Sequence, residues 1–238
     1  MDIRTVSASR GFDWIGEGFG LFRRNPLIWI VLLIIFLAVI TLLSLIPFVG
    51  SIASLLLQPV LVGGMLLGCR ALDDGEDLRI EHLFDGFHHH TKQLALVGLY
   101  GALGYFLIGL LVALAVGAGV GLGYWGGLEN QSGLVFGGAL IGLLAAGLFA
   151  TLLATPIIMA TWFAPALILF HDLPALAAMK LSFTGCLHNL AAFLIYGLGA
   201  LLLGFLAMVP AGLGLLVFGP TLVGSVYAGY KDIYKEAA

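Results

Sequence analysis

Residues 73–90 combine side chains that could bind a metal or carry out acid–base chemistry. The stretch mixes carboxylates with histidines, and His88, His89 and His90 are consecutive. Histidine and carboxylate ligands suit transition metals. Three successive residues on a helix point in different directions, however, so they cannot share one tetrahedral site. We therefore expect a titrating surface rather than a metal centre, and we expect no cofactor.

A second stretch places His171 next to Asp172 at the end of a long apolar run. Such a pair can act as a general acid and base. No nucleophile or metal-ligand motif accompanies it, so we interpret the pair as a helix cap and an interfacial anchor. Trp14 and Trp162 are the other candidate interfacial anchors. The sequence predicts no catalytic residue, and we expect the protein not to be an enzyme.

Prolines inside the apolar runs are candidate sites of movement. A proline within a helix removes one backbone hydrogen bond and kinks the helix, and the freed carbonyl needs a neighbouring group or water. One interpretation is a hinge or internal cavity at these prolines. The other is a packed kink with interhelical hydrogen bonds. The candidate residues are Gln58, Pro59, Thr155, Pro156, Pro165 and Pro220.

The composition indicates an integral membrane protein. Hydrophobic residues make up 61% of the chain and charged residues 10%, whereas soluble domains carry about 25% charged residues. Many of the 34 glycines lie in apolar runs, where small residues let helices approach closely. We therefore expect membrane lipids as partners, together with a second copy of the chain or another membrane protein, and no nucleic acid.

Six apolar segments are long enough to cross a membrane, because a crossing needs about 20 residues. None contains an ionisable residue, which weighs against a proton- or ion-coupled transporter. The fourth segment is either one kinked helix or a span plus a half-helix. Counted as one crossing, it puts all ten Lys and Arg residues on the cytoplasmic side with both termini. The segments are residues 27–46, 51–69, 94–115, 134–170, 189–208 and 212–230.

A repeated pattern organises these segments. After both Pro59 and Pro220 the chain reads one residue, Leu-Val-Gly, four residues, Gly, one residue and a base, which is Arg70 or Lys231. Amphipathic stretches at 9–24, 77–90 and 174–188 precede the outward spans. The sequence predicts an all-α integral membrane protein of six transmembrane helices, built from repeated units of an interfacial amphipathic helix plus a transmembrane hairpin. The units cover approximately residues 9–72, 77–170 and 174–233.

Four stretches carry a resemblance to a known family: "RTVSASRGFDWIGEGFGLFRRNPLIWI", "CRALDDGE", "WFAPALILFHDLPALAAMKLSFTGCLHN" and "YAGYKDIY". Through them the chain resembles a family of uncharacterised proteobacterial inner-membrane proteins. That family is related in layout to YciC-like proteins and to the membrane domain of some glycerophosphodiester phosphodiesterases. The resemblance implies an inner-membrane location and an all-helical fold, and it supplies no catalytic residue or substrate.

Two functions fit these features. The first is a non-enzymatic membrane scaffold, accessory or assembly protein that contacts lipids or a membrane partner, as its amphipathic stretches and glycine-rich spans indicate. The alternative is a carrier or channel for a lipid-like or small uncharged solute, gated at the proline kinks.

Overall fold

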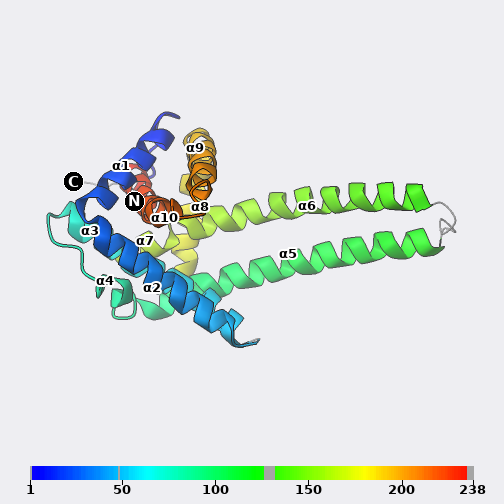
Figure 1. Cartoon of the computed structure of the whole chain (residues 1–238), viewed down its shortest axis with the longest axis horizontal. Helices are drawn as coiled ribbons and strands as arrows, with labels where there is room; N and C mark the ends of the chain where they lie inside the picture. The colour runs from blue at the N-terminus through cyan, green and yellow to red at the C-terminus, as the bar shows by residue number, and fades with distance from the viewer. Residues whose placement is uncertain (1, 48, 126–131, 235–238) are drawn as a thin grey trace. The chain divides into compact units, whose positions relative to one another are not determined.

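The computed structural model describes residues 2–47, 49–125 and 132–234, and ten helices account for most of them (Figure 1). By their contacts the residues group into two units. Unit 1 comprises Met1–Leu99 and Met159–Ala238, and unit 2 comprises Tyr100–Ile158. The helices are α1 (Arg10–Arg24), α2 (Pro26–Ser44), α3 (Val49–Asp73), α4 (His82–Asp85), α5 (Thr91–Trp125), α6 (Ser132–Trp162), α7 (Ala164–His171), α8 (Ala175–His188), α9 (Leu190–Met208) and α10 (Leu215–Ile233).

Five helical segments in the described residues are long and apolar enough to cross a membrane. They correspond to the first five predicted segments. Helix α10 coincides with the sixth, but polar and charged residues occupy its second half and it is not among the five. A sixth crossing therefore stays a prediction. The five are Pro26–Ser44, Val49–Asp73, Thr91–Gly117, Gly142–His171 and Leu190–Met208.

The described part of unit 2 consists of residues 100–125 of α5 and 132–158 of α6, which Figure 1 draws as two long helices. They contain 35 and 31 residues, more than the roughly 20 that a bilayer crossing requires. The side chain of Ile157 comes close to the backbone of Gly104, where the absence of a Cβ leaves room for it. Most large apolar side chains described in this unit are exposed, as lipid-facing side chains would be.

The ambiguous segment 134–170 forms two helices. The break is at Phe163, between α6 and α7, and Pro165 lies in the first turn of α7, where a proline fits because the missing N–H has no helical partner. Ser182 of α8 bridges the break. Its hydroxyl accepts a hydrogen bond from the Phe163 N–H at 3.0 Å and donates one to the Met159 carbonyl at 2.6 Å.

Helix α1 packs one face into unit 1 and leaves the opposite face exposed. It runs against α10 and α9 (Figure 1), and a Cβ on Gly18 would overlap the Thr221 carbonyl oxygen of α10. Among its large apolar side chains, Ile15 and Phe22 are buried but Phe12 and Phe19 are not. Phe12 and Phe19 are 63% and 43% exposed. The side of the helix that carries Gly11 and Gly18 faces inward instead, because glycines allow close contact between backbones. The buried residues are Gly11, Trp14, Ile15, Gly18, Leu21 and Phe22.

Helix α8 also buries a face that hydrophobicity does not predict. The large apolar side chains of Leu176 and Leu187 are 54% and 52% exposed. The inward face consists of small residues, and a Cβ on Gly185 would overlap the Tyr234 hydroxyl. Close approach of the helix backbone therefore decides which side is buried. The buried residues are Ala175, Ala178, Ser182, Gly185 and Cys186.

The expected amphipathic helix over residues 77–90 is much shorter than predicted. Only His82–Asp85 is helical, because Asp, Gly and His residues surround it and favour helices weakly. Leu83 is fully buried, and the Gly64 backbone of α3 approaches the His82 and Leu83 carbonyls. This short helix therefore packs directly against α3.

The junctions before α2 and α9 share their spacing and one backbone hydrogen bond. A single asparagine, Asn25 or Asn189, separates each of these 19-residue helices from the helix before it. The backbone N–H of each asparagine donates to a carbonyl three residues earlier, at 3.2 Å in both cases. This likeness supports the repeat of the first and third units, which stays a prediction.

Candidate functional site

A layer of charged side chains, which we call the charged layer, joins α1, α3 and α10 within unit 1. Arg10 is its centre at the start of α1. The Arg10 guanidinium donates to Asp232 of α10 at 2.6 Å and to Glu17 at 2.7 Å, and it lies 3.4 Å from Asp13. The hydrogen bond to Asp232 raises the pKa of Arg10 above its usual value. The layer comprises Arg10, Asp13, Glu17, Arg24, Asp73, Lys231 and Asp232.

Asp232 accepts a second hydrogen bond from the interior of the protein. The indole N–H of Trp14 donates to the same carboxylate oxygen at 2.8 Å, and Trp14 is 1% exposed. The Trp14 ring packs against Phe193 and Tyr196 of α9, with centroid distances of 5.5 Å and 6.1 Å. Asp232 therefore links the charged layer to the aromatic core.

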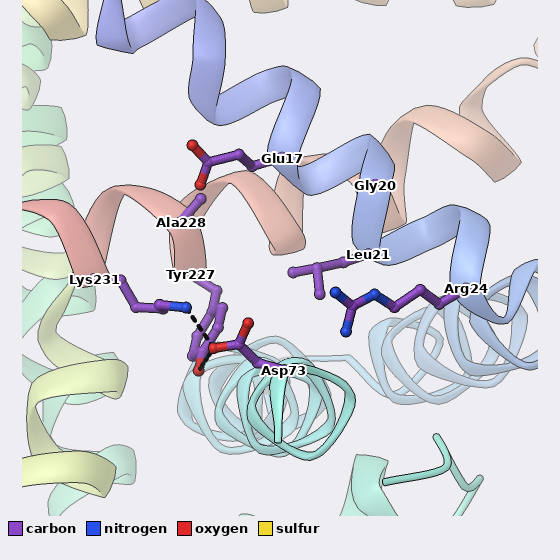
Figure 2. A pocket seen from close by; sticks show the side chains of 8 residues that line it. All are labelled: Glu17, Gly20, Leu21, Arg24, Asp73, Tyr227, Ala228 and Lys231. Atoms are coloured by element: carbon purple, nitrogen blue, oxygen red, sulfur yellow. Dashed lines mark hydrogen bonds and ion pairs between the residues drawn. The ribbon is translucent and has the colours of Figure 1, made fainter. Parts of the chain in front are cut away.

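A pocket lined by four members of the charged layer opens between α1, α3 and α10 (Figure 2). Its volume is about 280 Å³. Lys231 forms an ion pair with Asp73, and the Tyr227 hydroxyl donates to the same carboxylate at 3.4 Å. Arg24 donates to the Leu72 carbonyl. The lining residues are Glu17, Gly20, Leu21, Arg24, Asp73, Tyr227, Ala228 and Lys231.

Four lining residues share one face of α1. Glu17, Gly20, Leu21 and Arg24 follow the i, i+3, i+4, i+7 spacing of a helical stripe. Figure 2 shows the Arg24 side chain entering the pocket from one side and Lys231 from the other, with Asp73 between them. This site was not predicted from the sequence, although α1 carries two opposite charges, Glu17 and Arg24, on either side of Gly20.

The predicted proline sites of unit 1 do not line this pocket. Pro59 lies half-buried within α3, next to an exposed Gln58. Pro165 and Pro220 are buried in α7 and α10. Their assignment as a hinge or cavity stays a prediction.

Thr155 and Pro156 belong to unit 2, where both are exposed on α6. The Thr155 hydroxyl donates to the Thr151 carbonyl at 2.9 Å, a bond within the same helix. A hinge at this position also stays a prediction.

The candidate anchors occupy different environments. Trp14 is buried, and Trp162 is half-buried with its ring 5.8 Å from that of Tyr196. The structure places both rings in the aromatic core of unit 1, so the burial of the Trp14 side chain leaves it no exposed surface for lipid.

His171 and Asp172 are adjacent in sequence but contact different partners. His171 Nε2 lies 2.6 Å from the Tyr230 hydroxyl, and Asp172 lies 2.8 Å from His90 Nε2. Asp172 ends α7 in the left-handed conformation, with a φ of 54°. Asp172 is thus the C-cap residue of α7, and Pro174 is the N-cap residue of α8. Within the described residues, no group of three or more His, Cys, Asp or Glu side chains could hold a metal ion.

An all-helical chain with five apolar candidate spans is an integral membrane protein. Comparison with known proteins agrees. The chain is 33% identical over 241 residues to a protein of Burkholderia thailandensis that is named a probable inner membrane protein, and the alignment covers 96% of this chain and 84% of the relative. The chain belongs to the family of that inner membrane protein. No protein-family model matches the chain, and no solved structure matches it.

Proposed function

We propose that this protein is a non-enzymatic scaffold, accessory or assembly protein of the inner membrane. The observation that carries the proposal is the pairing within the charged layer. Arg10 binds Asp232, and Lys231 binds Asp73, so these ionisable groups hold helices together. Groups used in this way stabilise a platform and are not poised to act on a substrate. We also propose that the chain shares its layout with YciC-like proteins and with the glycerophosphodiester phosphodiesterase membrane domain.

We propose six crossings, with both termini in the cytoplasm. The Arg4 N–H donates to the Ile233 carbonyl at the end of α10, at 3.0 Å. Asn189, before α9, exchanges hydrogen bonds with Arg4 and Val6 at 2.9 Å and 2.8 Å. These bonds hold the first residues of the chain beside the last helix, which supports an even number of crossings. The basic residues favour the cytoplasm as the common side.

A partner or a second copy would dock on the glycines of unit 2. Gly109 and Gly117 of α5 and Gly142 and Gly147 of α6 have open space where a Cβ would be, with no atom within 4 Å. Open glycines allow another helix to approach the backbone closely in lipid. These positions support docking in the plane of the membrane.

The experiment compares two leucine substitutions by recovery of the partner from gently extracted membranes. Gly147→Leu should reduce recovery, because the new side chain separates the helices. Gly197→Leu is the matched control, since Gly197 of α9 is equally open and lies in unit 1. Unchanged recovery or self-association across Gly109→Leu, Gly142→Leu and Gly147→Leu would count against the proposal.

The carrier alternative has less support. It requires a path or cavity at the proline kinks, and the pocket of the charged layer is lined by none of the proline-site residues.

A further inference from the structure

We infer that the pocket of the charged layer binds a phospholipid headgroup that carries one phosphate and one primary ammonium, as phosphatidylethanolamine does. The inference deepens the proposed function, on which it rests, by naming the class of lipid that the scaffold contacts. Four observations carry it: the position of the pocket at the ends of two candidate spans, an arginine without a carboxylate partner, two carboxylates that each have a free oxygen, and the volume of the pocket.

The pocket lies where two candidate spans end. Arg24 precedes α2 by one intervening residue, and Asp73 is the last residue of α3. Both helices are candidate spans, so their ends lie at the boundary between hydrocarbon and headgroups. A phosphate at this depth belongs to a lipid.

Arg24 supplies the site for the phosphate. Among the described residues it has no ion-pair partner, and one of its N–H groups donates to the neutral Leu72 carbonyl. Its remaining N–H groups can bind phosphate oxygens in pairs, the geometry that makes arginine a common phosphate ligand. Gly20 stands one turn before Arg24, and no atom lies within 4 Å of the position of its missing Cβ, so the approach is open.

Glu17 and Asp73 supply the site for the ammonium. Glu17 uses Oε1 for Arg10, which leaves Oε2. Asp73 uses Oδ2 for both Lys231 and Tyr227, which leaves Oδ1. The pocket therefore offers carboxylate oxygens to a positive group as well as an arginine to a phosphate, which suits a ligand that carries both charges. A primary ammonium that enters the pocket can donate to either free oxygen.

The volume fits a headgroup. Sites for drug-sized ligands occupy roughly 300–1,000 Å³, and this pocket, at about 280 Å³, is smaller. The two acyl chains would remain outside, along the apolar surface of the spans.

The test is native mass spectrometry of the whole protein, delipidated in detergent and titrated with phosphatidylethanolamine or phosphatidylglycerol of matched acyl chains. Arg24→Gln should weaken the one-to-one complex with phosphatidylethanolamine about tenfold, because it removes a charge-assisted contact. Arg23→Gln is the control: it makes the same charge change one residue away on an exposed side chain outside the pocket. Equal losses in both variants would mean general surface attraction and would overturn the inference.

Two further variants test the remaining features without touching Arg24. Glu17→Gln should abolish the preference for phosphatidylethanolamine over phosphatidylglycerol, and Gly20→Leu should block both lipids by filling the pocket. A wild-type protein that binds the two lipids equally would overturn the assignment of the ammonium. Binding of soluble glycerophosphoethanolamine as tight as that of the lipid would overturn the lipid as the source.

Partner recovery separates this inference from the proposed function. Arg24→Gln should leave recovery of a partner intact, since the docking glycines lie in unit 2. If Arg24→Gln changes lipid binding but not partner recovery, the result bears only on the lipid site in the pocket. If Gly147→Leu does not reduce partner recovery, the result contradicts only the proposed scaffold.

Discussion

Asp232 is the residue on which the charged layer most depends, because Arg10 and Trp14 both donate to its carboxylate. Asp232→Asn removes the negative charge and should lower the free energy of unfolding by about 1.5–3 kcal/mol, the range for hydrogen bonds to charged groups. Thermal melting in detergent measures this change. Asp13→Asn is the control. Asp13 is half-exposed and 3.4 Å from Arg10, so its loss should cost at most about 1 kcal/mol. Equal effects of the two variants would contradict the assigned role.

The reactivity of the buried Cys186 thiol reports on the packing of α8. Burial raises the pKa of Cys186 from 9.0 to about 12. The folded thiol therefore stays protonated at pH 8.5, whereas the unfolded thiol is partly ionised. The Cys186 thiol therefore contributes fully to the free energy of unfolding below pH 9. Its contribution falls as the pH rises toward 12, because the unfolded thiol ionises first.

We expect a water-soluble maleimide to label Cys186 at pH 8.5 only after unfolding in detergent such as SDS. Peptide mass spectrometry identifies the labelled site and separates it from Cys69, which is also free and buried. Equally fast labelling of Cys186 in the folded and unfolded protein would show that α8 is not packed as described.

At the scale of the elements, the contact between α1 and α10 depends on the absence of a side chain at Gly18. Gly18→Ala would press a methyl group into the Thr221 carbonyl and should destabilise the protein by about 1–3 kcal/mol. Gly16→Ala on the same helix meets nothing within 4 Å. It should be neutral or stabilising by up to about 1 kcal/mol, because alanine favours helix more than glycine. Melting temperatures that fall equally would contradict the packing.

The positions of the spans follow from sequence because hydropathy is a local property. The segment predicted at 27–46 is the helix Pro26–Ser44, and that at 189–208 is Leu190–Met208. The buried faces of α1 and α8 do not follow, because glycine and alanine give little hydrophobic signal yet decide where backbones meet. The break at Phe163 also depends on a distant residue, since Ser182 bonds both sides of it.

The charged layer could be predicted only in part, because its members are far apart in the chain. Arg10 and Asp232 are separated by 222 positions, and no local pattern links them. The repeat did mark Arg70 and Lys231 as equivalent bases. In the structure each lies over an aromatic ring, Arg70 at 5.3 Å from the Phe170 centroid and Lys231 at 5.5 Å from that of Tyr227.

At the scale of the whole molecule, the proposed topology predicts that both termini face the cytoplasm. Green fluorescent protein fused to either end should fluoresce, and alkaline phosphatase fused to either end should be inactive. A fusion truncated after residue 47 is the control, since one crossing precedes it and its phosphatase should be active. Termini on opposite sides would mean an odd number of crossings, and α10 would then not span the membrane.

Native mass spectrometry of the protein extracted gently from its own membrane would show whether this chain serves as a scaffold in the inner membrane. A scaffold should appear in a stoichiometric complex with another membrane protein or further copies of itself, with phospholipid retained. A single chain that releases a bound small solute and carries no protein partner would contradict the scaffold and favour a carrier.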